Sequence, residues 1–395
     1  KIIMNKKEIL FNNIFGTIFN HTISIKYLDK KEKFYGQGEP KFKFYIKSKL
    51  NLKNIITNPS LTLGEAYMDD KIEVLGDLKE LIESIYNNKE SFLNKENKAL
   101  KVVRYGLTQL KRAKKNIEHH YDIGNNFYKL WLDDTMSYSC AYFKKSSDTL
   151  EEAQKNKIDY VLKKLLLKKD QTLLDIGCGW GGLILRAAKK YKVKALGITL
   201  SKEQYLEVKN RIANEHLENL VEVRLMDYRE IKNEKFDRIV SIGMLEHVGK
   251  DHLNEYFQKI YELLNEKSIS LVHTITGRNK GGNNEWINKY IFPEGYIPGI
   301  KEVINCIAEN DFMIRDVESL RQHYVKTLEY WAKNFESSLD EIKKIQDNRF
   351  IRMWRLYLNS CAASFNVGNI DIHQIIFSKG AINSLAWTRD YMYKE

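Results

Sequence analysis

The chain has 395 residues, of which 43% are hydrophobic and 29% are charged, so it is long enough for one large domain or two ordinary ones. Its four cysteines, at positions 140, 178, 306 and 361, lack the C-x-x-C spacing of a zinc or redox pair, and no apolar run approaches the length of a membrane span. The net charge of +12 favours an anionic partner, although frequent Lys, Asn and Ile are also what an AT-rich genome produces.

The N-terminal part, residues 1–92, is predicted to be a small α+β domain. Two stretches with alternating apolar residues, "TISIKYL" (22–28) and "KFKFYIKS" (41–48), are typical of half-buried strands, and "LGDLKELIESIYNN" (75–88) has helical periodicity. The start of the chain has no signal-peptide pattern and cysteines are sparse, so we expect a cytoplasmic protein.

Residues 93–117 are predicted to be a basic helical connector. Between Lys95 and Lys115 there are eight basic residues and one acidic residue. Lys95, Lys98, Lys101 and Arg104 recur every three positions, which places them near one face of a helix. Two interpretations remain open at this point: a solvated helix face, or a stripe that faces phosphate groups.

From about residue 170 the sequence alternates short apolar strands with amphipathic helices. One helix opens with Ser201 and carries Gln204 three residues later, which is the pattern of a capping box. Alternation of this kind implies a parallel sheet with helices on both faces, and therefore a doubly wound α/β domain within residues 118–395. We expect strands at 172–177, 193–200, 236–245 and 268–275, and helices at 181–191 and 201–217.

A glycine-rich turn, "DIGCGWGG" (175–182), joins the first of these strands to the first helix. Gly177, Gly179 and Gly181 form G-x-G-x-G, whereas the dinucleotide fingerprint has its third glycine one position later. A dinucleotide site and a purely structural turn stay possible on the pattern alone. The arrangement of strand, Asp175, glycines and helix resembles class I methyltransferases, which have a Rossmann-like fold and bind S-adenosylmethionine.

That resemblance implies a set of cofactor-binding residues. Gly177 and Gly179 would pass beneath the methionine part, and Asp175 would orient the loop or the ammonium group. Many such enzymes end the second strand with an acidic residue for the ribose, but here the region reads "GITLS". The remaining contacts would therefore come from Thr199 and Gln204 near the ribose and from Asp227 at the adenine amine.

Longer stretches give a closer resemblance. The sequence is similar to cyclopropane-fatty-acyl-phospholipid synthases and their mycolic-acid relatives over roughly residues 115–390, and "LGEAYMDDKIEV" (63–74) resembles the small domain of the phospholipid-acting members. The stretches that carry it are "HHYDIGNNFYKLWLDDTMSYSCAYF", "DIGCGWGG", "GITLSKEQ", "SIGMLEHVG", "LVHTITG", "WINKYIFPEG" and "WRLYLNSCAASFNVGNIDIHQIIFSKG".

The resemblance implies an enzyme that transfers a methylene group from S-adenosylmethionine to the cis double bond of unsaturated acyl chains in membrane phospholipids. A related acyl-chain methyltransferase with a methyl-branched or oxygenated product is the alternative. The implied general base is a bound bicarbonate ion, and no metal is expected. The matching residues are Cys140, Glu246, His273, Ile275 and Tyr324 around the bicarbonate, with Tyr138 and Ser139 facing the cofactor.

Family resemblance further implies a homodimer that associates peripherally with the inner face of the membrane. A nucleic-acid methyltransferase would also be basic, but it would usually need a pocket for a flipped base, in which the anion-site residues have no part. For Cys140 we expect a place in the wall of the anion site. Inert packing is the second interpretation. A role as nucleophile ranks last, because a nucleophilic cysteine needs an adjacent base and this chemistry needs no covalent enzyme intermediate.

Overall fold

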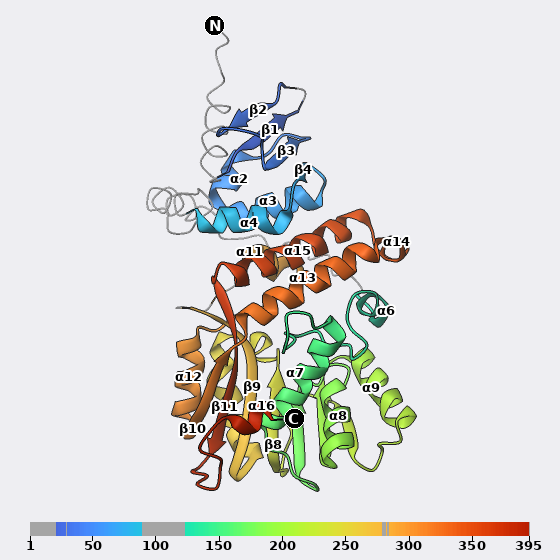
Figure 1. Ribbon diagram of the computed structural model, residues 1–395, viewed down its shortest axis with the longest axis vertical. Coiled ribbons are helices and arrows are strands. Elements are labelled where there is room, and N and C mark those ends of the chain that lie inside the picture. The colour runs from blue at the N-terminus through green and yellow to red at the C-terminus, as the bar shows by residue number, and fades with distance from the viewer. Residues whose placement is uncertain (1–20, 29, 89–122, 279–281, 283, 395) are drawn as a thin grey trace. The chain divides into compact units, whose positions relative to one another are not determined.

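The computed structural model in Figure 1 describes residues 21–28, 30–88, 123–278, 282 and 284–394. The chain forms two compact units. The first contains the described part of residues 1–122 together with 284–293 and 335–368, and the second contains the described parts of 123–283, 294–334 and 369–395. The predicted boundaries at 92/93 and 117/118, and the basic segment between them, lie outside the described residues.

The first unit has a four-stranded sheet with strand order β2-β1-β3-β4. The strands predicted at 22–28 and 41–48 are confirmed, and they pair in parallel, with Ile23 opposite Phe42. Side chains of β3 alternate between buried and half-buried, so Phe42, Phe44 and Ile46 face the core. The four strands are β1 (Ile23–Tyr27), β2 (Lys33–Tyr35), β3 (Phe42–Ile46) and β4 (Ile72–Leu75).

Two segments from late in the sequence join this unit, which was not predicted. Lys289 Nζ and Tyr290 Oη both lie 2.7 Å from Glu65 Oε1, so they bind α11 to α3. Helix α15 packs against α3 and α4, and Arg352 donates to the carbonyl of Ile72 at 2.7 Å. The helices of the unit are α2 (Leu52–Thr57), α3 (Pro59–Met68), α4 (Leu78–Asn87), α11 (Glu285–Tyr290), α14 (Leu339–Ile342) and α15 (Asn348–Asn366).

The second unit is built on a seven-stranded sheet with strand order β10-β11-β9-β8-β5-β6-β7. The strands from β9 to β7 are parallel, as predicted, but β11 runs antiparallel to both β9 and β10, so the sheet is mixed rather than wholly parallel. The strands are β5 (Thr172–Ile176), β6 (Lys194–Thr199), β7 (Val221–Leu225), β8 (Phe236–Ile242), β9 (Leu264–Gly277), β10 (Phe312–Ser319) and β11 (Ile370–Lys379).

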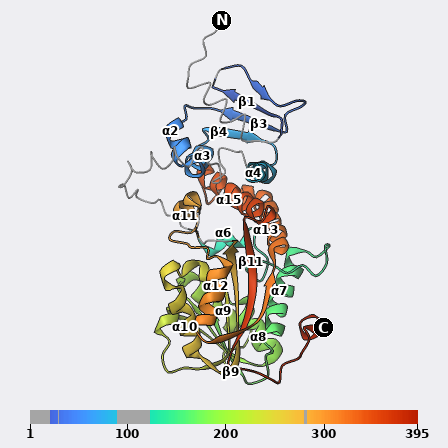
Figure 2. The same cartoon turned by 90° about the vertical axis from the view of Figure 1, so that its left-hand side faces the viewer.

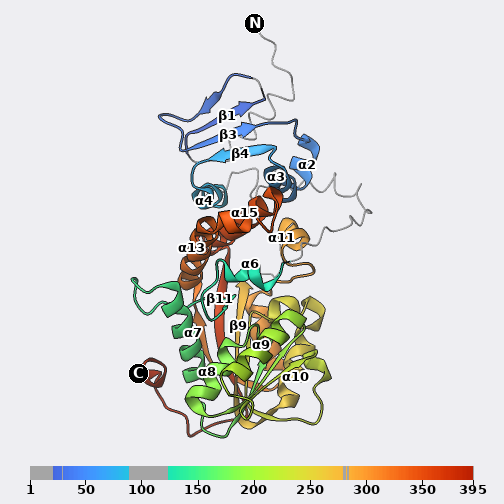
Figure 3. The same ribbon diagram turned by 90° about the vertical axis from the view of Figure 1, so that its right-hand side faces the viewer.

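Helices cover both faces of this sheet. Figures 2 and 3 show α7 (Leu150–Lys164) and α8 (Gly182–Tyr191) on one side and α10 (Leu253–Leu263) on the other. Figure 2 shows α12 (Ile300–Glu309) on the same side as α10. Residues of α9 (Lys202–Asn214) share a core with α7 and α8. The predicted doubly wound α/β fold is thereby confirmed. The remaining helical segments are α6 (Asn125–Lys129), α13 (Arg321–Ser337), α16 (Asp390–Tyr393) and the 3₁₀ turns η1 (Tyr228–Glu230), η2 (Leu245–His247) and η3 (Lys250–His252).

Within the described part of the chain, every helix is too short or too polar to span a lipid bilayer.

Candidate active site

The glycine turn lies where β5 ends. Gly177, Gly179 and Gly181 have φ angles of +83°, +55° and +82°, a region that favours glycine. A Cβ at Gly181 would approach Val208 to 3.0 Å, so that glycine serves the packing of α9. A Cβ at Gly179 would meet no described atom within 4 Å, so the backbone there borders open space. The turn therefore leaves room for a ligand beside Gly179.

Asp175 lies beneath this turn and is only 3% exposed. Burial raises the pKa of its carboxyl to about 7, and the positive charge of Lys157 opposes that shift. Lys157 itself is 3% exposed in α7, and burial lowers its pKa to about 8. Its Nζ donates to Ser139 Oγ at 2.7 Å. A buried lysine thus binds Ser139 and lowers the pKa of Asp175 electrostatically, and the sequence assigned both of these residues to the cofactor.

Sequence reasoning missed Lys157, although a signal was present. In "LEEAQKNKIDYVLKK" the buried residues Leu150, Ala153, Lys157 and Val161 follow helical spacing, so the lysine belongs to the core-facing side of the helix. A lysine on such a face needs partners, because burying an unpaired charge is costly.

The loop that carries Tyr138 and Ser139 is held by side chains behind it. Asp133 Oδ1 accepts the backbone N–H of Ser137 at 3.1 Å. Gln154 Nε2 donates to the carbonyl of Ser139 at 2.8 Å. The predicted cofactor loop is therefore fixed through its backbone.

Tyr138 belongs to a cluster of aromatic rings. Its ring centroid lies 5.4 Å from Tyr128, 5.5 Å from Trp131 and 5.4 Å from Trp331. Tyr324, which is 9% exposed, packs edge-on against Trp331 at 5.9 Å. The structure thus connects Tyr138 with Tyr324 through a single ring, although the two residues are far apart in sequence.

The predicted ribose and adenine residues lie at the ends of β6 and β7. Thr199 Oγ1 donates to Gln204 Oε1 at 2.8 Å and accepts the backbone N–H of Ser201 at 3.1 Å. Ser201 caps α9 by accepting the N–H of Gln204. The predicted capping box is therefore only partly formed. The Ser201 side chain caps the helix, but the Gln204 side chain binds Thr199 instead of the Ser201 N–H. Asp227 forms an ion pair with Arg229, with its Oδ2 2.7 Å from Nη2.

Glu246, His273 and Ile275 come together at the carboxyl ends of β8 and β9. Glu246 Oε1 accepts the backbone N–H of Ile275 at 2.6 Å. The other oxygen, Oε2, is buried and has no hydrogen-bond partner among the described residues. His273 is 1% exposed, and its Nδ1 lies 3.1 Å from Gln374 Nε2. Its Nε2 is likewise buried without a partner in the described structure.

Cys140 and Tyr324 connect to the same region through Leu320. The carbonyl of Leu320 lies 3.8 Å from Cys140 Sγ and accepts the N–H of Tyr324 at 3.0 Å. The N–H of Leu320 donates to the carbonyl of Ile372, which pairs with Ile275 across β11 and β9. A short chain of contacts therefore links Cys140, Tyr324, Ile275 and Glu246, and His273 lies two residues before Ile275 on β9.

Electrostatics at this edge of the sheet favour neutral groups. Burial raises the pKa of Glu246 to about 7, and the Ile275 N–H opposes the shift because it stabilises the carboxylate. Burial, together with the positive charges of Lys157 and Lys164, holds the pKa of His273 well below its usual value. Burial raises the pKa of the Cys140 thiol, so this cysteine stays protonated and is poorly suited to be a nucleophile.

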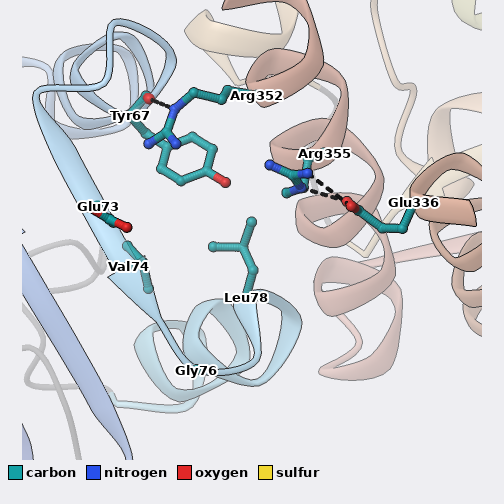
Figure 4. A pocket seen from close by; sticks show the side chains of 8 residues that line it. All are labelled: Tyr67, Glu73, Val74, Gly76, Leu78, Glu336, Arg352 and Arg355. Carbon is teal, nitrogen blue, oxygen red and sulfur yellow. Dashed lines mark hydrogen bonds and ion pairs between the residues drawn. The ribbon is translucent and has the colours of Figure 1, made fainter. Parts of the chain in front are cut away.

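A separate cavity of about 330 Å³ lies in the first unit (Figure 4). Two arginines line it, and each already donates two hydrogen bonds. Arg355 forms two hydrogen bonds to the Glu336 carboxylate, at 2.5 and 2.8 Å, and Arg352 donates to the backbone carbonyls of Tyr67 and Ile72. These contacts hold α15 in place and leave the cavity with little net charge to attract an anion.

Comparison with known proteins finds relatives that match most of the chain. Residues 108–375 match the sequence model of a family described as mycolic acid cyclopropane synthetase, and residues 10–97 match one described as a domain of unknown function. The chain is 39% identical over 351 residues to a probable fatty acid methyltransferase of Pseudomonas putida, with 86% of this chain and 88% of that protein covered.

Two further matches are to a curated relative and to a solved structure. Identity to the cyclopropane-fatty-acyl-phospholipid synthase of Escherichia coli K12 is 37% over 345 residues, covering 85% of this chain and 88% of that protein. Among solved structures, mycolic acid cyclopropane synthase CmaA1 complexed with SAH and CTAB superposes with a TM-score of 0.62 at 37% identity. That match covers 69% of this chain and all of the other.

Proposed function

Because the chain belongs to the mycolic acid cyclopropane synthetase family of S-adenosylmethionine-dependent enzymes, we propose that it converts cis double bonds of unsaturated phospholipid acyl chains into cyclopropane rings. One observation carries the proposal beyond family membership. Glu246 Oε2 and His273 Nε2, a buried acceptor and a buried ring nitrogen, both lack partners among the described residues at the edge where the glycine turn lies. Such a pair fits a small ligand that both accepts and donates hydrogen bonds.

The residues around the glycine turn fit S-adenosylmethionine, which supplies an electrophilic methyl group when bound. The open space beside Gly179 would admit the methionine part, and Asp175 and Ser139, linked by Lys157, would orient it. Thr199 and Gln204 would bind the ribose hydroxyls. Asp227 would have to share its carboxylate between Arg229 and the adenine amine, which its four lone-pair sites allow.

An isolated alkene is a weak nucleophile, so the protein must supply orientation. Holding the double bond in line with the methyl group can contribute about 7–11 kcal/mol to lowering the barrier. One alkene carbon would take the methyl group as its bond to sulfur breaks, S-adenosylhomocysteine would be left, and the neighbouring carbon would become cationic. Loss of one proton from the new methyl group lets the ring close. The site therefore needs a base close to the cation and little water.

Bicarbonate fits the role of this base and supplies a proton acceptor when bound. Glu246 Oε2 would accept its hydroxyl proton, and His273 Nε2 and the Tyr324 hydroxyl would donate to its oxygens. Ile275 would contribute through its backbone, because its N–H binds Glu246 Oε1 and so fixes the direction of the carboxylate. Cys140 would form a wall of the site as a neutral thiol.

The aromatic cluster supports the cationic stage of the reaction. Rings stabilise a nearby cation by about 0.5–2 kcal/mol per contact. Tyr324 is the ring that we assign to this role, since it belongs both to the anion-site set and to the contact with Trp331. Tyr142 stacks on Tyr160 at 4.2 Å and Tyr290 belongs to the first unit, so we assign neither to the cation.

We place the enzyme in the cytoplasm, bound peripherally to the inner face of the membrane and acting as a homodimer. The substrate chains lie in a bilayer, and the basic residues between Lys95 and Lys115 could each contribute about 1 kcal/mol of attraction to an anionic lipid surface. Sedimentation of the purified protein would test the dimer.

Turnover decides between the proposed reaction and its rivals. The purified protein is incubated with S-adenosylmethionine and vesicles of unsaturated phospholipid, and the acyl chains are analysed by mass spectrometry after chemical reduction. We expect each product chain to gain one CH₂ unit. A cyclopropane chain should also stay unchanged under conditions that hydrogenate an alkene. A methyl-branched alkene or an oxygenated chain would indicate the related acyl-chain methyltransferase instead, and unchanged lipid would refute both.

A further inference from the structure

A buried row of polar side chains lies behind His273. Lys164, on α7, donates to Gln374 Oε1 at 2.7 Å and forms an ion pair with Glu318. Gln374, on β11, stands opposite His273 in the strand pair, with its Nε2 3.1 Å from His273 Nδ1. Lys164 and Gln374 are both 0% exposed, and the reaction as described so far uses neither.

The row has a direction. A lysine ammonium group can only donate hydrogen bonds, so the Gln374 atom that faces Lys164 must be the carbonyl oxygen. The amide NH₂ of Gln374 therefore faces His273, and Nδ1 of the ring must accept from it. A neutral imidazole carries one proton, and with Nδ1 accepting, that proton is on Nε2.

We propose that Lys164 and Gln374 are positioning residues that lock His273 in the Nε2–H tautomer, so that the ring presents a hydrogen-bond donor to the anion site. The inference rests on the proposed function for its catalytic consequence, but the tautomer itself can be observed without any substrate. With the opposite tautomer, Nε2 would be a lone pair facing the anion, and the interaction would become repulsive.

The surroundings fit this role. A buried lysine close to the ring disfavours the doubly protonated imidazolium, which is consistent with the low pKa of His273. Glu318 offsets the lysine charge, and Tyr160 Oη donates to Glu318 Oε2 at 2.9 Å. A buried ion pair adds little stability compared with apolar packing. The Lys164–Glu318 pair is therefore better explained by its orientation of the Gln374 amide than by a contribution to stability.

Histidine NMR tests the proposal directly on the full-length protein. The chain has nine histidines, so ¹⁵N-labelled wild type is compared with His273→Asn to assign the His273 ring. We expect the wild-type ring to be neutral with the proton on Nε2. In Gln374→Glu the new carboxylate can only accept at neutral pH, so we expect the proton to move to Nδ1.

Two further variants make the test specific. Lys164→Met removes the cation that orients the Gln374 amide. The amide can then flip, so we expect a mixture of the two His273 tautomers. Glu318→Gln leaves Lys164 and Gln374 in contact and serves as the matched control, with the Nε2–H tautomer retained. A wild-type ring protonated on Nδ1 would by itself contradict the proposal, so a variant that fails to fold does not leave it untested.

Activity provides the second readout. We expect Gln374→Glu to lower kcat by about 10²–10⁴-fold, the range typical of general acid–base groups, with the KM for S-adenosylmethionine unchanged and the response to bicarbonate lost. A wild-type ring protonated on Nδ1, or a Gln374→Glu ring still protonated on Nε2, would overturn the proposal. If the tautomers behave as expected but wild type forms no cyclopropane, the role of Lys164 and Gln374 in fixing the tautomer is supported and the proposed function is refuted.

Discussion

The Glu246 carboxylate is bound on one side only. Its Oε1 accepts the backbone N–H of Ile275 at 2.6 Å, while its Oε2 is buried without a hydrogen-bond partner among the described residues. A group held in this way is oriented by the strand beneath it and keeps its second oxygen available for a ligand. The same arrangement should cost stability, because the hydrogen bonds to the carboxylate offset only part of the cost of burying its charge.

The pH dependence of stability should reveal that cost. Burial raises the pKa of Glu246 from the usual 4.5 to about 7. Between these values the native state holds a proton that the unfolded chain has lost, so the free energy of unfolding falls as the pH rises through this window. Glu246→Gln does not titrate and still accepts the Ile275 N–H. We therefore expect it to be more stable than wild type by roughly 1–3 kcal/mol at pH 8.

Denaturant unfolding at pH 5 and pH 8 measures the difference. The gain from Glu246→Gln should be small at pH 5 and large at pH 8. An equal gain at both values would show that Glu246 is not strained by burial of its charge.

The glycine turn predicts a specific loss of cofactor affinity. Gly179→Ala places a methyl group in the open space beside the turn, and we expect at least about a tenfold weaker affinity for S-adenosylmethionine, or 1.4 kcal/mol, by calorimetry. Gly368→Ala is the matched control, since Gly368 also has positive φ, at +74°, and also borders no described atom within 4 Å. Both changes strain the backbone, but only the first should weaken binding.

Lys157 should matter for the cofactor although it is buried. Lys157→Met removes the donor to Ser139 and the positive charge that opposes the raised pKa of Asp175. The Asp175 carboxylate should then hold its proton more tightly, so we expect weaker binding of S-adenosylmethionine at pH 7 and partial recovery at higher pH. Lys155→Met, on the exposed side of the same helix, should have no such effect. Equal binding curves for the two variants would rule out this role.

The basic segment predicts salt-sensitive membrane binding. Neutralising Lys98, Lys101, Arg104, Lys111 and Lys115 together should reduce co-sedimentation with anionic phospholipid vesicles, and activity should fall in parallel. Wild-type binding should weaken as salt screens the attraction, and neutral vesicles should bind both proteins alike. Unchanged sedimentation of the variant would mean that these residues form only a solvated surface.

Local patterns made much of the second unit predictable. The strand β5, the glycine turn and α8 follow from apolar runs and glycines that are adjacent in sequence, and the site edge follows because parallel strands end on the same side. The antiparallel strand β11 was not predicted, since nothing in its sequence specifies the direction in which it pairs. For the same reason Gln374 could not be placed beside His273, 101 residues away.

Other features depend on packing between distant segments. Residues 284–293 and 335–368 read as part of the C-terminal domain, yet contacts such as Lys289 with Glu65 place them in the first unit. Lys157 and Lys164 look like ordinary helix lysines until the fold buries them. The resemblance indicated Ile275 as a site residue, but only the structure shows that its N–H is committed to Glu246.

The central claim is that Glu246 positions the base. Glu246→Gln keeps the shape and the bond to Ile275 but loses the charge that strengthens its hydrogen bond to bicarbonate, and charge-assisted bonds are roughly twice as strong as neutral ones. The decisive measurement is turnover on unsaturated phospholipid vesicles by wild type and Glu246→Gln, each with and without exhaustive removal of bicarbonate. We predict about a 10²–10⁴-fold lower rate for the variant with unchanged affinity for S-adenosylmethionine, and a bicarbonate requirement in wild type only. A variant with wild-type turnover and an undiminished response to bicarbonate would contradict the account.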